Sequence, residues 1–151
     1  MNSLKPEILK AIKQVLSLRV EAARKAMAEA QESANSEEKS SAGDKYETSR
    51  AMSQNQRDMN ARQMLEAHNA VMELEQYEKS KPYSNAFPGA LIQTQDALYF
   101  MGPGLGKLAS ENGIEFISLS AKAPLGNLFL GKKAGESVVF QGKEIRIVEV
   151  M

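Results

Sequence analysis

The chain has 151 residues, enough for one or two small domains, and its 42% hydrophobic content with only 6% aromatic residues predicts a modest, mostly aliphatic core. Lys and Arg balance Asp and Glu at nineteen each, so the strong positive charge of a dedicated duplex-binding protein is missing, and we expect no independent sequence-specific DNA binding. The chain contains no cysteine, which excludes disulfides, thiolate metal sites and thiol nucleophiles.

The sequence gives no sign of a targeting or membrane segment. Its first residues lack an apolar core of signal-peptide length, and no apolar run approaches the roughly eighteen residues that a membrane span needs. We therefore expect a soluble, cytoplasmic protein with no membrane partner.

The composition changes sharply near residue 80. All five Phe, nine of the ten Gly and four of the five Pro lie beyond Lys81, whereas the first eighty residues are rich in Met and Ala. Such a shift marks a boundary between two differently built units. We predict an α+β protein with a helical domain over residues 1–80 and a β domain over residues 83–151.

The first predicted helix starts at Lys5, with Pro6 tolerated in its first turn and Glu7 near the positive end of the helix dipole. Its apolar residues follow one another at steps of three or four and form a single stripe along one face. The stripe consists of Leu9, Ile12, Leu16, Val20, Ala23, Met27, Ala30 and Ala34.

The second predicted helix starts near Asp44 and has a weaker stripe that includes polar Gln56 and Gln63. Neither helix would be stable alone in water, but the two can shield each other as an antiparallel coiled-coil hairpin of about 45 Å with its tip at residues 40–47. The apolar positions that we place on the second stripe are Met52, Met59, Ala67, Ala70, Leu74 and Tyr77, with Met64 and Met72 also expected to pack in the seam.

The remainder of the chain has the pattern of a small, mostly antiparallel sheet with one short helix. Residues 90–100 predict two strands, or one bent strand, broken near Gln95, and residues 101–106 predict a turn or loop. The pattern then predicts a strand at 114–120, a short helix at 124–130, and a terminal hairpin of residues 138–140 and 145–150 that turns at Gly142.

Two stretches together resemble the Gre family of bacterial transcription elongation factors. Residues 124–138, PLGNLFLGKKAGESV, resemble the family's Pro, Leu-Leu-Gly-Lys and Gly-Asp/Glu-x-Val pattern, with Ala123 where the family usually has serine. At the predicted tip, Gly43, Asp44 and Glu47 match the family's Gly-Asp-x-x-Glu motif. Beyond this motif, Thr48, Arg50 and Ala51 replace the family's Asn, Glu and Tyr.

The resemblance implies an FKBP-like β domain that docks on bacterial RNA polymerase and a coiled coil that enters the secondary channel. The factor would not be an enzyme. Its Asp44 and Glu47 would instead act as the catalytic carboxylates that help the polymerase to hold a second Mg²⁺ and cleave backtracked RNA, with only indirect contact to the nascent transcript. We also expect Gly43, Lys45 and Arg50 to shape the tip.

Polymerase docking by the β domain is expected near the matched stretch, at Pro124, Gly126, Gly131 and Lys132. Two of the glycines in this stretch also have a conformational use. Gly131 can end a helix with positive φ, and Gly135 can turn the chain into the next strand.

A purely structural role for the tip residues remains open. Asp44 is a good N-cap, and Glu47 completes a capping-box pattern in which the two side chains satisfy free backbone N–H groups. Such caps begin many helices. The spacing alone therefore fits both a helix start and a pair of metal ligands.

Other functions also remain open. A Gre-like protein could occupy the channel and modulate or inhibit the polymerase without stimulating cleavage, which the replacements after Glu47 favour. A prolyl isomerase would need an aromatic-lined pocket, whereas strand alternation assigns most aromatic residues to the core. The helical arm could also dimerise as a structural coiled coil.

Overall fold

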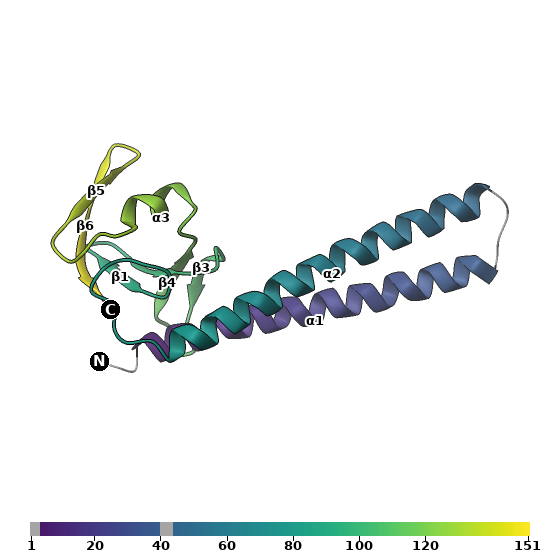
Figure 1. The fold of residues 1–151 in the computed structure, drawn as a ribbon, viewed down its shortest axis with the longest axis horizontal. Helices are drawn as coiled ribbons and strands as arrows, with labels where there is room; N and C mark the ends of the chain where they lie inside the picture. Colours follow the sequence, from purple (N-terminus) through teal and green to yellow (C-terminus); the bar gives the residue numbers. More distant parts are fainter. Residues whose placement is uncertain (1–3, 40–43) are drawn as a thin grey trace. The chain divides into compact units, whose positions relative to one another are not determined.

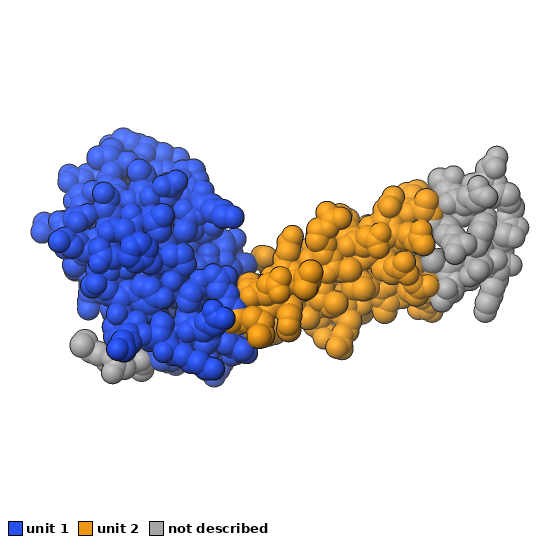
Figure 2. Space-filling view, viewed as in Figure 1, with its two compact units in different colours: residues 1–14, 73–151 blue, residues 15–72 orange. Residues whose placement is uncertain are grey.

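A computed structural model describes residues 4–39 and 44–151, and the side chains of residues 4–32 and 51–151. The chain forms two compact units (Figure 2). One consists of residues 15–72, and the other combines residues 1–14 with residues 73–151. The fold is α+β, as predicted: two long helices come first, followed by a six-stranded mixed sheet with one short helix.

Helix α1 spans Leu4–Lys39 and helix α2 spans Asp44–Glu78. The two helices run antiparallel, because Arg57 Nη1 donates a hydrogen bond of 2.6 Å to Gln31 Oε1, while nearer the other ends Lys13 Nζ lies 3.7 Å from Glu75 Oε1. Figure 1 shows them side by side. The predicted helical hairpin is therefore confirmed over the residues that the structure describes.

The predicted stripe of α1 is confirmed. Leu9, Ile12, Leu16 and Ala23 are buried, and Val20, Met27 and Ala30 are half-buried at the intervening turns. The stripe is well defined because large aliphatic side chains occupy one face of the helix only. The last predicted member, Ala34, lies outside the side chains that the structure describes.

The predicted stripe of α2 is partly wrong. Ala67 and Leu74 are buried as expected, but Met52 and Met59 are exposed. Gln56 and Gln63, which we placed between the seam residues, are exposed as well. Met72 is also exposed, whereas Met64 is half-buried and Ala70 and Tyr77 lie at the edge of the seam.

The polar residue in the seam is Asn60 rather than a glutamine. Its side chain is only 5% exposed. Gln56 Nε2 donates a long hydrogen bond of 3.4 Å to Asn60 Oδ1, whereas Asn60 Nδ2 has no partner among the residues that the structure describes. A buried donor without a partner destabilises the pair of helices by about 1–3 kcal/mol.

The sheet has the strand order β3-β4-β2-β1-β6-β5. Strands β2 and β4 pair in parallel, and the other neighbours pair antiparallel. The bounds are β1 Leu91–Thr94, β2 Leu98–Met101, β3 Gly106–Ala109, β4 Glu115–Leu119, β5 Ser137–Phe140 and β6 Lys143–Val150, with helix α3 at Pro124–Phe129.

Most of the predicted β elements are confirmed. The break near Gln95 separates β1 from β2, and β5 and β6 form the terminal hairpin that turns through Gln141 and Gly142, both at positive φ. Strand β3 was missed because it begins at the end of the predicted loop, at Gly106, and its residues are mainly exposed. It is held in place by backbone pairing with β4 at an edge of the sheet.

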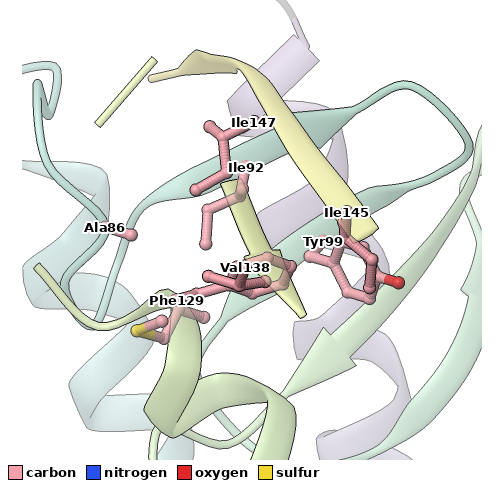
Figure 3. Packing of buried hydrophobic residues seen from close by; sticks show 8 residues of the cluster. Ala86, Ile92, Tyr99, Phe129, Val138, Ile145 and Ile147 are labelled. Atoms are coloured by element: carbon pink, nitrogen blue, oxygen red, sulfur yellow. The ribbon is translucent and has the colours of Figure 1, made fainter. Parts of the chain in front are cut away.

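The main core of the sheet lies between the sheet and α3 (Figure 3). Phe129 of α3 packs edge-on against Tyr99 of β2, with ring centroids 5.2 Å apart. Members of this cluster alternate with residues that point away from it, as the strand pattern requires. The cluster consists of Ala86, Ile92, Tyr99, Met101, Phe129, Val138, Ile145 and Ile147.

The ends of the two long helices that belong to this unit contact the sheet directly. The ring of Tyr77 in α2 lies edge-on to Phe100 of β2, with centroids 6.1 Å apart. Glu7 of α1 accepts a hydrogen bond of 2.8 Å from the hydroxyl of Ser110, in the turn between β3 and β4. Lys10 Nζ lies 3.2 Å from Glu111 Oε2 in the same turn.

Across the described ranges 4–39 and 44–151, we find no helix that combines the length and the apolar character needed to cross a membrane.

Candidate functional site

The predicted tip lies between the two long helices. Residues 40–43, including Gly43, lie outside the described residues, and α2 begins at Asp44. Lys45, Glu47 and Arg50 belong to its first two turns, although the side chains of these residues also lie outside the part that the structure describes.

The backbone brings Asp44 and Glu47 into the first turn of α2. Residues three apart on a helix lie on the same side, about 5–6 Å apart at their Cβ atoms. The first turn of a helix is also where the helix dipole in general stabilises negative charge. The capping interpretation uses the same location and remains open.

Two arginines of α2, Arg57 and Arg62, follow the predicted tip along the chain and differ in their contacts. Arg57 is half-buried and donates its hydrogen bond to Gln31 across the seam, whereas Arg62 is exposed. Arg57 therefore helps to hold the two helices together near the tip. Only Arg62, of these two, presents its charge mainly to solvent.

The second candidate region is the segment from Pro124 to Gly135, which contains α3. Pro124 occupies the first turn of α3, where its missing N–H costs no hydrogen bond. Ala123 is the N-cap residue, and no side chain caps this end of the helix. A serine at this position could accept a hydrogen bond from the first turn, so Ala123 removes a stabilising contact.

The glycines in this segment are required by the fold. A Cβ on Gly126 would overlap the carbonyl oxygen of Ser120, so α3 can approach the preceding loop only with glycine there. Gly131 follows the end of α3 with a φ of +82°, which is strained for residues with a side chain. Its N–H donates a hydrogen bond of 2.8 Å to Ala86 O, which ties the end of α3 to the segment before β1.

The side chains available for docking on this segment are those that the fold leaves exposed. Leu128 and Leu130 are 39% and 43% exposed, respectively, and Lys133 is exposed next to half-buried Lys132. Sequence reasoning selected Gly126 and Gly131 in this segment and did not select the two leucines. Leu128 and Leu130 are the direct neighbours of Phe129 in the sequence, so burial of Phe129 turns them toward solvent, and this spacing is the feature of the sequence that could have identified them.

Four aromatic residues of the β domain are packed in the core. Phe100, Phe116 and Phe129 are fully buried, and Tyr99 packs against Phe129 (Figure 3). These rings therefore do not line an open pocket of the kind that a prolyl isomerase requires.

Within the described part of the chain, no group of three or more His, Asp or Glu side chains could hold a metal ion. Asp44 and Glu47 are not covered by this statement, because their side chains lie outside the described part of the chain. Two carboxylates leave most of the near-octahedral shell of Mg²⁺ unfilled. This pair fits the role of completing a metal site on another molecule better than the role of forming one alone.

Comparison with known proteins found no matching family model and no matching curated protein.

Proposed function

We propose that this protein is a Gre-like transcription elongation factor that binds bacterial RNA polymerase and stimulates cleavage of backtracked RNA. Its helical hairpin would enter the secondary channel with the segment at residues 40–47 leading. Its sheet with α3 would form the FKBP-like domain that remains outside and docks on the polymerase.

The observation that carries the proposal is the position of the helix break. Two helices of 36 and 35 residues, each about 50 Å long, are separated only by residues 40–43. The Gly-Asp-x-x-Glu match, Gly43 to Glu47, spans the end of this break and the first turn of α2. A long, thin pair of helices with two carboxylates at its turn suits delivery of negative charge into a narrow channel.

In the proposed complex, Asp44 and Glu47 would add oxygen ligands to a metal ion that the polymerase holds only loosely. Such an ion stabilises the attacking and leaving oxygens during hydrolysis of a phosphodiester. Lys45 and Arg50 would shape the tip and balance its charge beside the RNA. The chain itself carries out no step beyond supplying and orienting these groups.

Docking would involve the surface around α3. Pro124, Gly126 and Gly131 set the shape of this surface, and Lys132 lies at its border. The exposed side chains of Leu128 and Leu130 are the groups of this segment best able to contact a partner. Replacing both leucines with Ser should weaken capture of the polymerase, measured below the unfolding temperature of the variant, because loss of their partly buried surface also destabilises the domain by about 1–2 kcal/mol.

The test of the cleavage function is a transcript-cleavage assay on a stalled, backtracked elongation complex. The double variant Asp44→Asn/Glu47→Gln keeps much of the capping capacity and removes both charges. We expect it to bind polymerase like the wild type and to lose at least about tenfold in cleavage rate, as expected when an oriented metal ligand is removed. Glu29→Gln/Glu66→Gln, which neutralises two exposed carboxylates elsewhere on the helices, is the matched control.

Full cleavage activity of the double variant, with the polymerase still bound, would refute the metal role. A second candidate is a channel-binding regulator that does not stimulate cleavage, which the replacement of a family glutamate by Arg50 favours. For that protein, the same assay would show competition with an active Gre factor and no shortened RNA. Failure of the wild-type chain to capture polymerase would refute both functions.

A further inference from the structure

A cavity of about 710 Å³ lies in the unit that contains the sheet, and no residue of α3 lines it. Its walls come from the first turns of α1, the end of α2 with the residues that follow it, and the end of β6. The volume is within the range of about 300–1,000 Å³ that is typical of small-molecule sites.

The walls of the cavity are mostly apolar. Pro6 and Leu9 of α1, Tyr77 of α2, Pro82 and Val150 line it. Leu9 is buried, and Tyr77 is held in place by its ring contact with Phe100 and by the hydrogen bond from its hydroxyl to Glu73. Such walls can cover a flat or aliphatic body of a ligand without rearrangement.

Lys5 provides a positive charge at the wall of this cavity. Its Nζ lies 4.4 Å from the centre of the Tyr83 ring and donates a long hydrogen bond of 3.5 Å to Met151 O. No carboxylate side chain among the described residues lies within 4 Å of it. Partial burial lowers the pKa of Lys5 below the ordinary value of a lysine.

The acidic residues near the cavity leave this charge available. Glu78 Oε1 lies 3.4 Å from Lys13 Nζ, and Glu7 in the first turns of α1 accepts hydrogen bonds from Ser110 and the Asn112 N–H. Glu149 also lines the cavity, but its side chain is exposed to solvent, where its charge is screened. The positive end of α1, which begins at Leu4, adds to the field of Lys5.

We propose that this cavity binds a small organic anion with an apolar body, whose carboxylate pairs with Lys5 and whose ring or chain packs on Leu9, Tyr77 and Val150. The contacts of the amine are Met151 O and the Tyr83 ring, no described carboxylate side chain lies within 4 Å of it, and the apolar walls lie beside it. An anion of this kind satisfies both at once, since a charge-assisted hydrogen bond forms at one end and apolar surface is buried at the other.

The probe for this site is 2-naphthoate, compared with 2-naphthylmethanol as a neutral molecule of the same shape. The chain contains no Trp, so the fluorescence anisotropy of the probe can be followed without interference from that residue. We expect saturable binding of naphthoate with a Kd below about 1 mM. Lys5→Met should weaken naphthoate binding about tenfold or more and leave naphthylmethanol binding nearly unchanged.

Lys79→Met is the matched control, because Lys79 is an exposed lysine at the end of α2 that does not line the cavity. It should bind both probes like the wild type. Lys5→Arg should retain most of the affinity because it keeps the charge. Methyl NMR should show the signals of Leu9 and Val150 shifting during the naphthoate titration.

Three results would each overturn the proposal: no saturable naphthoate binding, equal affinity in the wild type and Lys5→Met, or methyl shifts confined to residues outside the cavity. The assay contains no polymerase. Its failure therefore leaves the proposed transcription function untouched, and failure of that function leaves this site untouched.

Discussion

Replacing Asn60 should strengthen the pair of helices. Asn60 is buried in the seam, and its Nδ2 has no partner among the described residues. The variant Asn60→Leu removes this donor, whose lack of a partner costs about 1–3 kcal/mol, and adds apolar surface to the seam. Asn60→Asp keeps the size of the side chain and places a charge in the same location.

We expect Asn60→Leu to raise the free energy of unfolding by about 2 kcal/mol, because crowding of the larger side chain offsets part of the gain. For a chain of this size, that increase corresponds to a rise in Tm of about 4–8 °C. Asn60→Asp should lower stability by about 3 kcal/mol at neutral pH, since the charge would be buried without a partner.

The measurement is thermal unfolding followed by circular dichroism at the helical band. Asn69→Leu, at an exposed position of the same helix, is the control and should change stability by no more than about 0.5 kcal/mol. If Asn60→Asp were tolerated and Asn60→Leu gained nothing over Asn69→Leu, the seam would be hydrated at this point and the reasoning would be wrong.

Two further predictions concern the sheet. Gly126→Ala should lower the free energy of unfolding by about 3 kcal/mol, because the added Cβ would clash with the Ser120 carbonyl oxygen. Gly131→Ala should lower it by only about 1 kcal/mol, because the added Cβ meets open space and only the positive φ is strained. Urea unfolding measures both changes. Hydrogen bonds from Gln14 and Lys10, together with the charge of Lys10, hold the pKa of the Glu111 carboxyl below its ordinary value. The charged carboxylate therefore stabilises the fold at pH values above the ordinary pKa, and this stabilisation is lost as the pH falls through the lowered pKa. Carbon-detected NMR titration of the Glu111 carboxyl should give a depressed pKa that returns toward normal in Lys10→Met; an ordinary pKa in the wild type would contradict this contact.

The elements predicted best are those whose side chains carry a one-sided pattern. In α1, Leu9, Ile12 and Leu16 are large, aliphatic and confined to one face, so the buried stripe follows from their spacing. In α2, apolar residues occur on several faces. Met52 and Met59 were as plausible as Ala67 and Leu74, and only packing against α1 distinguishes them.

The parts that could not be predicted depend on contacts between distant segments. Strand β3 has little apolar alternation and forms through backbone pairing with β4, and the parallel pairing of β2 with β4 leaves no local trace in the sequence. At the candidate tip, the sequence located the start of α2 at Asp44, whereas the metal role that we propose for its carboxylate needs a partner molecule and has no local signature beyond the motif. In the segment around α3, the glycines stood out by their residue type, whereas exposure of Leu128 and Leu130 depends on which face Phe129 buries.

The compact unit that contains the sheet is made from two separated pieces of the chain, residues 1–14 and 73–151. Lys13 and Glu75 lie within 3.7 Å of each other where these pieces leave the unit, so a few flexible residues could join Gln14 directly to Glu73. Such a miniature protein would keep the contacts of Glu7 and Tyr77 with the sheet that a fragment starting at residue 83 would lose. Under the proposed function, it would keep the docking surface around α3 and lack the helical tip, so it should compete with the full-length chain for polymerase without supporting cleavage.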